Sequence, residues 1–306
     1  MSESRVRRSA PQIESILQSS YRVESTLLAD PDLSKLHKES KAEDGATIFI
    51  PNWNHKHYLP RSIRSAISAV GPLKEAGFSA EILIIDDASR DGSQKFLRTI
   101  QMLYEEVPLN TVLLKRNLGL PRLRNLAMQI SRYRYVCMMD ADNELVADNL
   151  PLFLRSIVET GAALVHGNLI DKQGERVIQL KSNEAASMLL TIGSRIDAFT
   201  LVDARKLLRV GGYLSDPRLV YEDWEMILHL IAEEEKVVFV PVVMGHYHRS
   251  PGSMFEETTE KRGPKAGAPS PEMVALVRRM YAQTGTREWD TIQVGHIYHP
   301  AVGYIS

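Results

Sequence analysis

Four successive apolar runs, each followed by an amphipathic stretch, constrain the fold of this chain most strongly. The runs are short enough to be strands buried on both faces, and they span residues 46–50, 81–85, 111–114 and 135–139. The stretches that follow them carry apolar residues at helical spacing, over 59–70, 96–104, 123–130 and 152–158. Strands and helices that alternate in this way predict an α/β fold with a mostly parallel central sheet and helices on both faces.

The second half of the chain is less regular but contains the same kinds of element. Further strands are expected at 163–166, 199–202 and 237–243, and helices at 204–208 and 222–235. A polar stretch at 171–174 predicts a hairpin or loop. We therefore expect one α/β domain over residues 46–254. Residues 1–45 are predicted to be a helical extension, and residues 255–306 a linker or lid with a helix and a tail.

Composition and charge exclude several classes of function. With a formal net charge of −1 over 306 residues, the chain has no global field that favours nucleic acid or an anionic membrane. Its single cysteine, Cys137, excludes an intrachain disulfide and lies in an apolar run, where a small buried side chain is expected. The chain shows neither a signal-peptide pattern nor a run of ~18 apolar residues that would span a membrane. We expect a cytoplasmic protein and leave peripheral contact with the inner membrane face open.

Two of the predicted strands end in pairs of acids. Asp86 and Asp87 follow the run at 81–85, and Asp140 and Asp142 follow the run at 135–139. In a doubly wound sheet, ligands bind at the carboxyl ends of the strands, so both pairs are expected at one crevice. Two hard oxygen ligands suit Mg²⁺ or Mn²⁺ with phosphate. A polar turn that binds no metal is the structural alternative.

Two loops supply groups that suit a nucleotide. Pro51, Asn52, Trp53 and Asn54 follow the first strand, and they offer an aromatic face for a base and amides for its edge. The stretch 115–125 contains Gly119 and Arg124 beside a predicted helix start, an arrangement that favours anionic phosphate. Simple packing of Trp53 and a solvated surface loop remain the structural alternatives.

Two acids and two histidines later in the chain are candidates for the chemistry. Glu222 and Asp223 open a predicted helix, where one of them could act as a general base or merely favour the helix start. His246 and His248 lie at strand spacing, so one face would carry both, and either could complete a metal site.

Six motifs in this order resemble the inverting glycosyltransferases of family two, which have the GT-A fold. The motifs lie between residues 46 and 254: Pro51-Asn52-Trp53-Asn54, Asp86-Asp87-Ala88-Ser89-Arg90-Asp91-Gly92-Ser93, Asn117-Leu118-Gly119 with Arg124-Asn125, Asp140-Ala141-Asp142, Gly211-Gly212-Tyr213 and Glu222-Asp223-Trp224. The resemblance implies a nucleotide-diphosphate sugar donor, usually a UDP-sugar, and Mn²⁺ or Mg²⁺.

The resemblance also implies a role for each motif. Asp87 would contact the base, with Trp53 and Asp86 beside it, and Asn117, Gly119 and Arg124 belong to the donor site. Asp142 would be the main metal ligand, with Asp140 on the ribose or on metal-bound water. Asp223 matches the catalytic base, with Glu222 the second choice. His248, or His246, resembles the histidine that some members add to the metal.

Two alternatives remain open at this stage. A sugar-1-phosphate nucleotidyltransferase has a similar sheet and metal but normally carries a Gly-rich loop after its first strand, where this chain has Pro51 to Asn54. The second alternative is a GT-A-like subunit of a larger assembly that binds a ligand but does not turn it over. The glutamine-x-x-arginine-tryptophan motif of processive polymerases is absent, which favours transfer of a single sugar to a glycan, a lipid-linked acceptor or a small molecule.

Overall fold

The computed structural model describes residues 42–181, 196–215 and 221–249, together with Ala275 and the backbone of 297–299 and 303–305. Nearly all of the predicted N-terminal extension, and most of residues 255–306, lie outside the described residues. The bounds predicted for the domain and its extensions therefore stay predictions.

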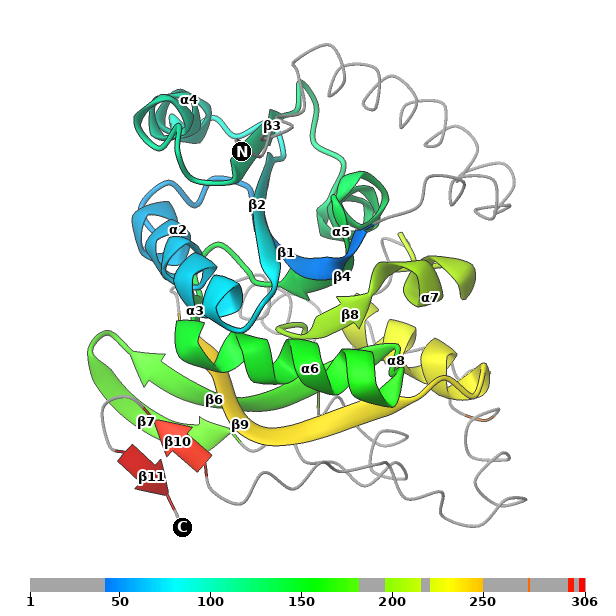
Figure 1. Cartoon of the computed structure of the whole chain (residues 1–306). Coiled ribbons are helices and arrows are strands. Elements are labelled where there is room, and N and C mark those ends of the chain that lie inside the picture. Colours follow the sequence, from blue (N-terminus) through cyan, green and yellow to red (C-terminus); the bar gives the residue numbers. More distant parts are fainter. Residues whose placement is uncertain are drawn as a thin grey trace, which may run out of the picture. The chain divides into compact units, whose positions relative to one another are not determined.

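The first half of the chain forms the parallel part of the sheet (Figure 1). Strands β1 (Ala42–Asn52), β2 (Ser79–Asp86), β3 (Leu109–Leu113) and β4 (Tyr133–Met138) lie in the order β3-β2-β1-β4, and every neighbouring pair is parallel. They are joined by α2 (Leu59–Ser68), α3 (Val70–Glu75), α4 (Ser93–Leu103) and α5 (Leu120–Ile130). The predicted alternation of strands and helices is confirmed, although the helix expected over 59–70 is two helices.

β1 runs through Pro51, where the sequence led us to expect its end. Pro51 lies opposite Ile85 of β2, whereas the pairing of β1 with β4 stops at Phe49 and Met138. The proline therefore stands where β1 has one neighbour only, which is where a strand tolerates a residue without an N–H. This extension carries Asn52 to the end of β2, opposite Asp86.

The second half extends the same sheet with mixed pairing. From β4 the order continues through β8 (Leu201–Asp203), β6 (Leu164–Gln173), β9 (Val237–His248) and β5 (Glu144–Leu145), with β7 (Arg176–Lys181) paired to β6. β8 is antiparallel to both of its neighbours, and β6 and β9 are parallel. The helical elements here are η2 (Ala147–Asn149), α6 (Leu150–Thr160), α7 (Ala204–Arg209) and α8 (Glu222–Ala232). A separate antiparallel pair, β10 (Ile297–His299) and β11 (Gly303–Ile305), lies near the C-terminus.

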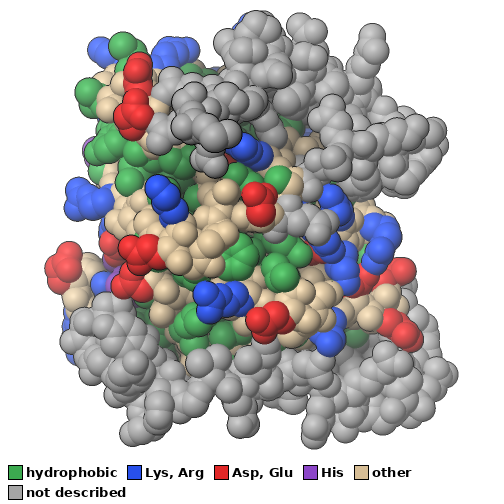
Figure 2. Space-filling view, in the orientation of Figure 1, with side chains coloured by type: hydrophobic (Ala, Val, Ile, Leu, Met, Phe, Trp, Pro, Cys, Tyr) green, Lys and Arg blue, Asp and Glu red, His purple; other side chains and the backbone are tan. Residues whose placement is uncertain are grey.

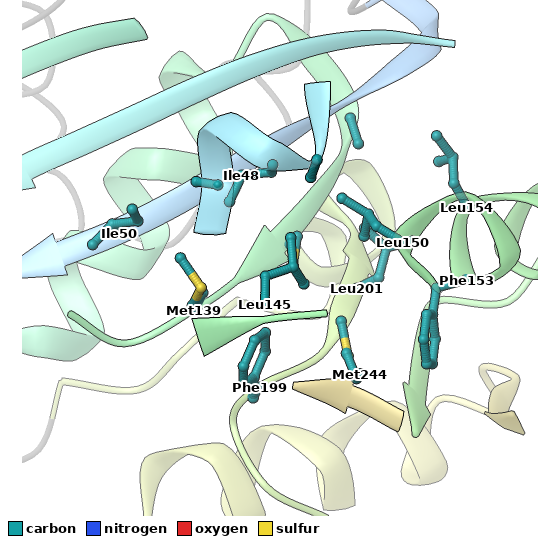
Figure 3. Packing of buried hydrophobic residues seen from close by; sticks show 14 of the residues in the cluster. Ile48, Ile50, Met139, Leu145, Leu150, Phe153, Leu154, Phe199, Leu201 and Met244 are labelled. Carbon is teal, nitrogen blue, oxygen red and sulfur yellow. The ribbon is translucent and has the colours of Figure 1, made fainter. Parts of the chain in front are cut away.

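Helices cover both faces of the sheet. α3 contacts both α2 and α6 in one layer, and α5 and α7 contact each other in another (Figure 1). The core includes buried side chains of β1, α6 and β9, together with Phe199 (Figure 3). Cys137 is fully buried in β4, as predicted, and burial raises the pKa of its thiol. The expected α/β fold with a central sheet and helices on both faces is confirmed.

Basic side chains gather over α7 on the face shown in Figure 2, with acidic side chains next to them. Lys206 Nζ lies 2.9 Å from Glu235 Oε2, and Arg209 also pairs with the Glu235 carboxylate. Glu235 therefore offsets part of the positive charge of α7.

Candidate active site

Asp86, the first acid at the end of β2, fixes the loops that follow β1 and β2. Its side chain is fully buried, and one oxygen accepts a hydrogen bond of 2.6 Å from Asn52 Nδ2. The other oxygen accepts from the Ser89 N–H at 3.0 Å and from Gln94 Nε2 at 2.9 Å. Three donors satisfy this buried carboxylate, so its role within the protein is to fix the positions of the two loops relative to each other.

Asp87, the second acid, connects the same edge to the loop before α5. Its two carboxylate oxygens accept the Leu118 N–H at 2.7 Å and the Gly119 N–H at 2.9 Å, and Asn117 Nδ2 lies 3.3 Å from its carbonyl oxygen. Gly119 has a φ of +86° directly before α5, a conformation that glycine adopts without strain. Asp87 is nearly fully buried, and its carboxylate fixes the backbone at Leu118 and Gly119.

Trp53 lies at the rim of this edge. Its side chain is 56% exposed, while the neighbouring Asn54 is fixed by two hydrogen bonds. The Asn54 N–H donates to Ser89 Oγ at 2.9 Å, and Asn54 Oδ1 accepts from the Arg90 N–H at 2.8 Å. The loop backbone is therefore held in place, and it presents a large apolar ring to solvent.

Arg124 on α5 links the acid at the end of β4 to the acid at the start of α8. Its Nη1 lies 2.6 Å from Glu222 Oε1, and its Nη2 lies 3.3 Å from Asp140 Oδ1. The side chains of Arg124 and Glu222 are nearly buried, whereas the side chain of Asp140 is 36% exposed. Burial alone would lower the pKa of Arg124, but the charges of Asp140 and Glu222 outweigh it and raise the pKa. The guanidinium is therefore a fixed positive charge inside the site.

Asp223, next to Glu222, has an unusual protonation equilibrium. Asp223 is partly exposed, and desolvation of its carboxyl, reinforced by the charge of Glu222 and opposed by Arg124, raises its pKa to about 7. Its Oδ1 accepts the Trp224 N–H at 2.8 Å, and Glu222 is engaged with Arg124. Neutral pH thus divides Asp223 between its acid and base forms, which is the property that a general base needs.

Asn125, the residue after Arg124, clamps the turn that follows α7. Its Oδ1 accepts the Tyr213 N–H at 2.8 Å, and its Nδ2 donates to the Tyr213 carbonyl at 2.8 Å. Gly212 has a φ of +66°, and a Cβ there would lie 2.4 Å from Asn125 Oδ1. The Tyr213 ring, in turn, lies 5.2 Å from the Arg124 guanidinium carbon. This explains why position 212 is a glycine: only a residue without a side chain fits against the Asn125 amide.

The Asp140–Asn143 segment forms a turn between β4 and β5. The Asn143 N–H donates to the Asp140 carbonyl at 3.1 Å, and the Arg61 guanidinium donates to the Asp142 carbonyl. Asn143 Oδ1 accepts the His248 N–H at 3.1 Å, which attaches the turn to β9. The side chains of Asp140 and Asp142 are both partly exposed, so solvent cations can reach them.

His246 and His248 lie on one face of β9, as their spacing predicted, but their partner is Glu144 of β5. Glu144 Oε2 lies 2.6 Å from His248 Nε2 and 3.5 Å from His246 Nδ1. Hydrogen bonds from His246 and His248 lower the pKa of the Glu144 carboxyl. In the part of the chain that the structure describes, the group of metal-ligand side chains that converges is Glu144, His246 and His248, and it includes neither Asp140 nor Asp142.

The structure thus brings some predicted residues together and keeps others apart. Arg124, Asp140, Glu222 and Asp223 form one cluster, and Asn52, Asp86, Asp87, Asn117 and Gly119 form another at the ends of β1 and β2. Glu144 and Asn143 were missed by the sequence reasoning. Their signal was weak, because a two-residue strand such as β5 shows no periodicity.

Comparison with known proteins identifies the family. The family model described as Glycosyl transferase family 2 matches residues 47–207, which is more than half of the chain. The chain belongs to this family. The resemblance inferred from the six motifs is therefore confirmed, and glycosyl transfer is the reaction class of the family.

A curated family 2 relative is similar over part of its length. The glycosyltransferase TuaG of Bacillus subtilis (strain 168), assigned to teichuronic acid biosynthesis, is 26% identical over 117 residues. The alignment covers 38% of this chain and 43% of TuaG, so the chain spans less than half of that relative.

Two solved structures share the fold. TarS 1–349 of S. aureus, in complex with UDP-GlcNAc, has a TM-score of 0.56 and 17% identity, over 78% of this chain and 66% of TarS 1–349. The mannosyltransferase PcManGT of Pyrobaculum calidifontis, in complex with GDP-Man and Mn²⁺, has a TM-score of 0.55 and 14% identity, over 90% of this chain and 82% of PcManGT.

Among the described residues, no helix combines the length and apolar character of a membrane span.

Proposed function

We propose that this chain transfers a single sugar from a nucleotide-diphosphate sugar to an acceptor hydroxyl, with inversion at the anomeric carbon. The observation that carries the proposal is Asp223, whose pKa is raised to about 7 at the start of α8, beside the Arg124–Glu222–Asp140 cluster. Family membership supports the reaction class. The complexes of TarS with UDP-GlcNAc and of PcManGT with GDP-Man support a nucleotide-sugar donor, and we expect a UDP-sugar.

The donor would lie along the carboxyl ends of β1, β2 and β4. Trp53 offers its exposed face to the base, and Asp87, which the family resemblance assigns to the base, lies at the end of β2. Pro51, Asn52, Asn54 and Asp86 shape this end of the site. Asn117 and Gly119 lie in the loop that Asp87 holds, and Arg124 supplies positive charge for the diphosphate.

Asp140 and Asp142 would hold Mn²⁺ or Mg²⁺ at the diphosphate. Both carboxylates are accessible, and hard oxygen ligands on a turn are the donor set that these cations prefer. A cation bound there would neutralise the charge that develops on the leaving diphosphate. His248 or His246 would have to turn away from Glu144 to join Asp142, so the histidine contribution expected from the resemblance stays a prediction.

The chemistry assigned to Asp223 is a direct displacement. Its carboxylate takes the proton of the acceptor hydroxyl, and the hydroxyl oxygen forms the new bond to the anomeric carbon. The bond from that carbon to the diphosphate oxygen breaks, and its electron pair leaves with the nucleotide diphosphate. Attack from the side opposite the leaving group inverts the anomeric configuration. Glu222 is the second choice for the base, because Arg124 holds it in a 2.6 Å ion pair.

Substitution at the two adjacent acids tests this proposal. The purified full chain is incubated with Mn²⁺ and a panel of UDP- and GDP-sugars, and the nucleotide diphosphate released when the sugar passes to an acceptor or to water is measured. Asp223→Asn cannot take a proton, so turnover should fall about 10²–10⁴-fold while donor affinity stays unchanged. Glu222→Gln is the matched control.

Three outcomes would contradict the proposal. Normal turnover in Asp223→Asn with loss in Glu222→Gln would move the base to Glu222. Binding of a nucleotide-sugar without any turnover by the unsubstituted chain would favour a subunit that only binds. Formation of a nucleotide-sugar from a sugar-1-phosphate would favour a nucleotidyltransferase.

A further inference from the structure

One face of the β7–β6–β9 part of the sheet carries polar side chains that take no part in the chemistry proposed above. Asp171 on β6 lies opposite Tyr247 of β9. Lys181, at the end of β7, lies opposite Leu169, which is two residues before Asp171. Residues opposite each other in neighbouring strands share a face, as do residues two apart in one strand. Asp171, Tyr247 and Lys181 therefore lie on one face, whereas the two histidines of β9 alternate with Tyr247 and lie on the other.

Lys181 is held on this face by an aromatic ring and by a carboxylate. Its Nζ lies 4.2 Å from the centre of the Tyr247 ring and 3.4 Å from Asp197 Oδ2. Asp197 is fixed in turn, because its Oδ1 accepts the N–H of the buried Phe199 at 3.0 Å. The side chains of Lys181 and Asp197 are 32% and 16% exposed, so a solute can reach this ion pair.

The ion pair lies close to the proposed base and to the turn that follows β4. Desolvation is the largest cause of the raised pKa of Asp223, and the charge of Asp197 adds to it, so these two carboxyls are neighbours. Tyr247 directly precedes His248, whose N–H donates to the turn between β4 and β5. The ion pair therefore borders the region in which an acceptor hydroxyl has to reach Asp223.

The ion pair suits a ligand that both accepts and donates hydrogen bonds. An ammonium has three N–H donors, and the contact with Asp197 uses one of those of Lys181. The partly exposed Asp197 carboxylate accepts hydrogen bonds from a ligand on its solvent side. Neighbouring hydroxyls of a neutral sugar match this pair, because one accepts and the other donates. An anion would be attracted by the ammonium but repelled by the carboxylate 3.4 Å from it.

We propose that Lys181 and Asp197, with Tyr247 holding the ammonium in place, form a subsite for the acceptor, and that this acceptor is a neutral sugar. The inference rests on the proposed function, since it places the acceptor of that reaction. Lys181 donates to one hydroxyl of the acceptor sugar, and Asp197 accepts from a second. These two contacts direct the reacting hydroxyl toward Asp223.

Binding of the acceptor is tested without turnover. Saturation-transfer NMR of the full chain, with UDP and Mg²⁺, is recorded for the methyl glycosides of glucose, galactose, mannose and N-acetylglucosamine and for the anionic methyl glucuronide. We expect a neutral glycoside to bind. Lys181→Gln and Asp197→Asn should each weaken its binding about tenfold or more, because each substitution removes a charged partner of a sugar hydroxyl. Arg176→Gln is the matched control: it removes an exposed cation at the other end of β7 and should leave binding unchanged.

Steady-state kinetics locate the subsite on the acceptor side. Lys181→Gln should raise the KM for the acceptor glycoside about tenfold, whereas the KM for the donor should change less than about twofold. A rise of equal size in the donor KM would place Lys181 at the donor and overturn the proposal. Arg176→Gln should leave both constants unchanged.

Three binding results would also overturn the proposal. These are no binding of any neutral glycoside by the folded, unsubstituted chain, binding that survives both substitutions, and tighter binding of the glucuronide than of every neutral glycoside. The last would make Lys181 an anion site. Binding that depends on Lys181 and Asp197, in a chain that transfers no sugar, would refute the proposed function and leave a sugar-binding subsite, so the two failures are distinguishable.

Discussion

At the scale of single residues, Asp223 combines a proposed catalytic role with a cost in stability. Its pKa rises from an ordinary value of 3.8 to about 7, because burial and the neighbouring Glu222 both disfavour the ionised form. The same shift that prepares the carboxyl to exchange a proton near neutral pH makes the folded protein less stable when that carboxyl is ionised. Rate and stability should therefore respond to pH in opposite directions.

The rate of sugar transfer should rise with pH through about 7. A general base works in its ionised form, and Asp223 is protonated below its pKa of about 7. The measurement is the pH dependence of nucleotide diphosphate release, with a fixed saturating donor and Mn²⁺. A profile without an inflection between about pH 5.5 and about pH 8.5 would mean that another group takes the proton.

Asp223→Asn should be more stable than the unsubstituted protein, and the gain should depend on pH. The folded state holds the Asp223 proton more tightly than the unfolded state, so the stability contributed by this group is lost as pH rises from 3.8 through about 7. Asparagine does not titrate, so the gain should be absent below the ordinary pKa, grow up to about 7 and then level off. Urea unfolding at about pH 4 and about pH 8 measures it.

Glu222→Gln provides the contrast in the same unfolding experiment. It removes one acid of the pair but also the 2.6 Å ion pair with the buried Arg124. An incompletely compensated buried charge is costly, so this variant should lose stability at both pH values. Equal stabilisation in both variants would show that general repulsion between the acids, and not the raised pKa of Asp223, limits stability.

At the scale of elements, α5 fixes the turn after α7 through Asn125. Asn125→Ala would leave the buried N–H and carbonyl of Tyr213 without partners, at a cost of about 1–3 kcal/mol for each group. Gly212→Ala should also destabilise, because its Cβ would lie 2.4 Å from Asn125 Oδ1. Both free energies of unfolding are measured by urea titration.

The double variant separates the two causes of the Gly212 effect. In the Asn125→Ala background the close contact is gone, and only the positive φ of Gly212 remains as a cost of about 1 kcal/mol. Gly212→Ala should therefore cost less in that background than in the unsubstituted protein. Equal costs in both backgrounds would show that the contact with Asn125 is not what requires glycine here.

At the scale of the whole molecule, donor and metal should stabilise the fold together. UDP with Mn²⁺ should raise the melting temperature more than UDP with a chelator, and a hundredfold excess over the dissociation constant corresponds to ~2.7 kcal/mol. Asp142→Ala should lose the metal-dependent part of this shift. Asp148→Ala, an exposed acid on η2 nearby in the chain, is the matched control and should retain it. An equal shift with and without metal would remove Asp140 and Asp142 from the donor metal site.

Much of this fold was predictable because its evidence is local. Apolar runs such as 81–85 and 135–139 are long enough to be recognised as buried strands. Because a helix connects each strand to the next, parallel pairing is the expected arrangement. The acids at the strand ends could be placed at one edge for the same reason. The antiparallel insertion of β8 between β4 and β6 could not be predicted, because a three-residue strand carries no signal for its partners.

The sequence by itself therefore determined the fold class, the family and the acids at the carboxyl ends of the strands, since periodicity and motif order depend on near neighbours in the chain. Only the tertiary structure decided which charges meet. Arg124 and Glu222 are far apart in sequence and 2.6 Å apart in space, and this pairing distinguishes Glu222 from Asp223. Likewise, the carboxylate of Glu144 lies beside His246 and His248, because the pairing of β5 with β9 brings these residues together. Electrostatic roles depend on distances across the fold, which no local pattern contains.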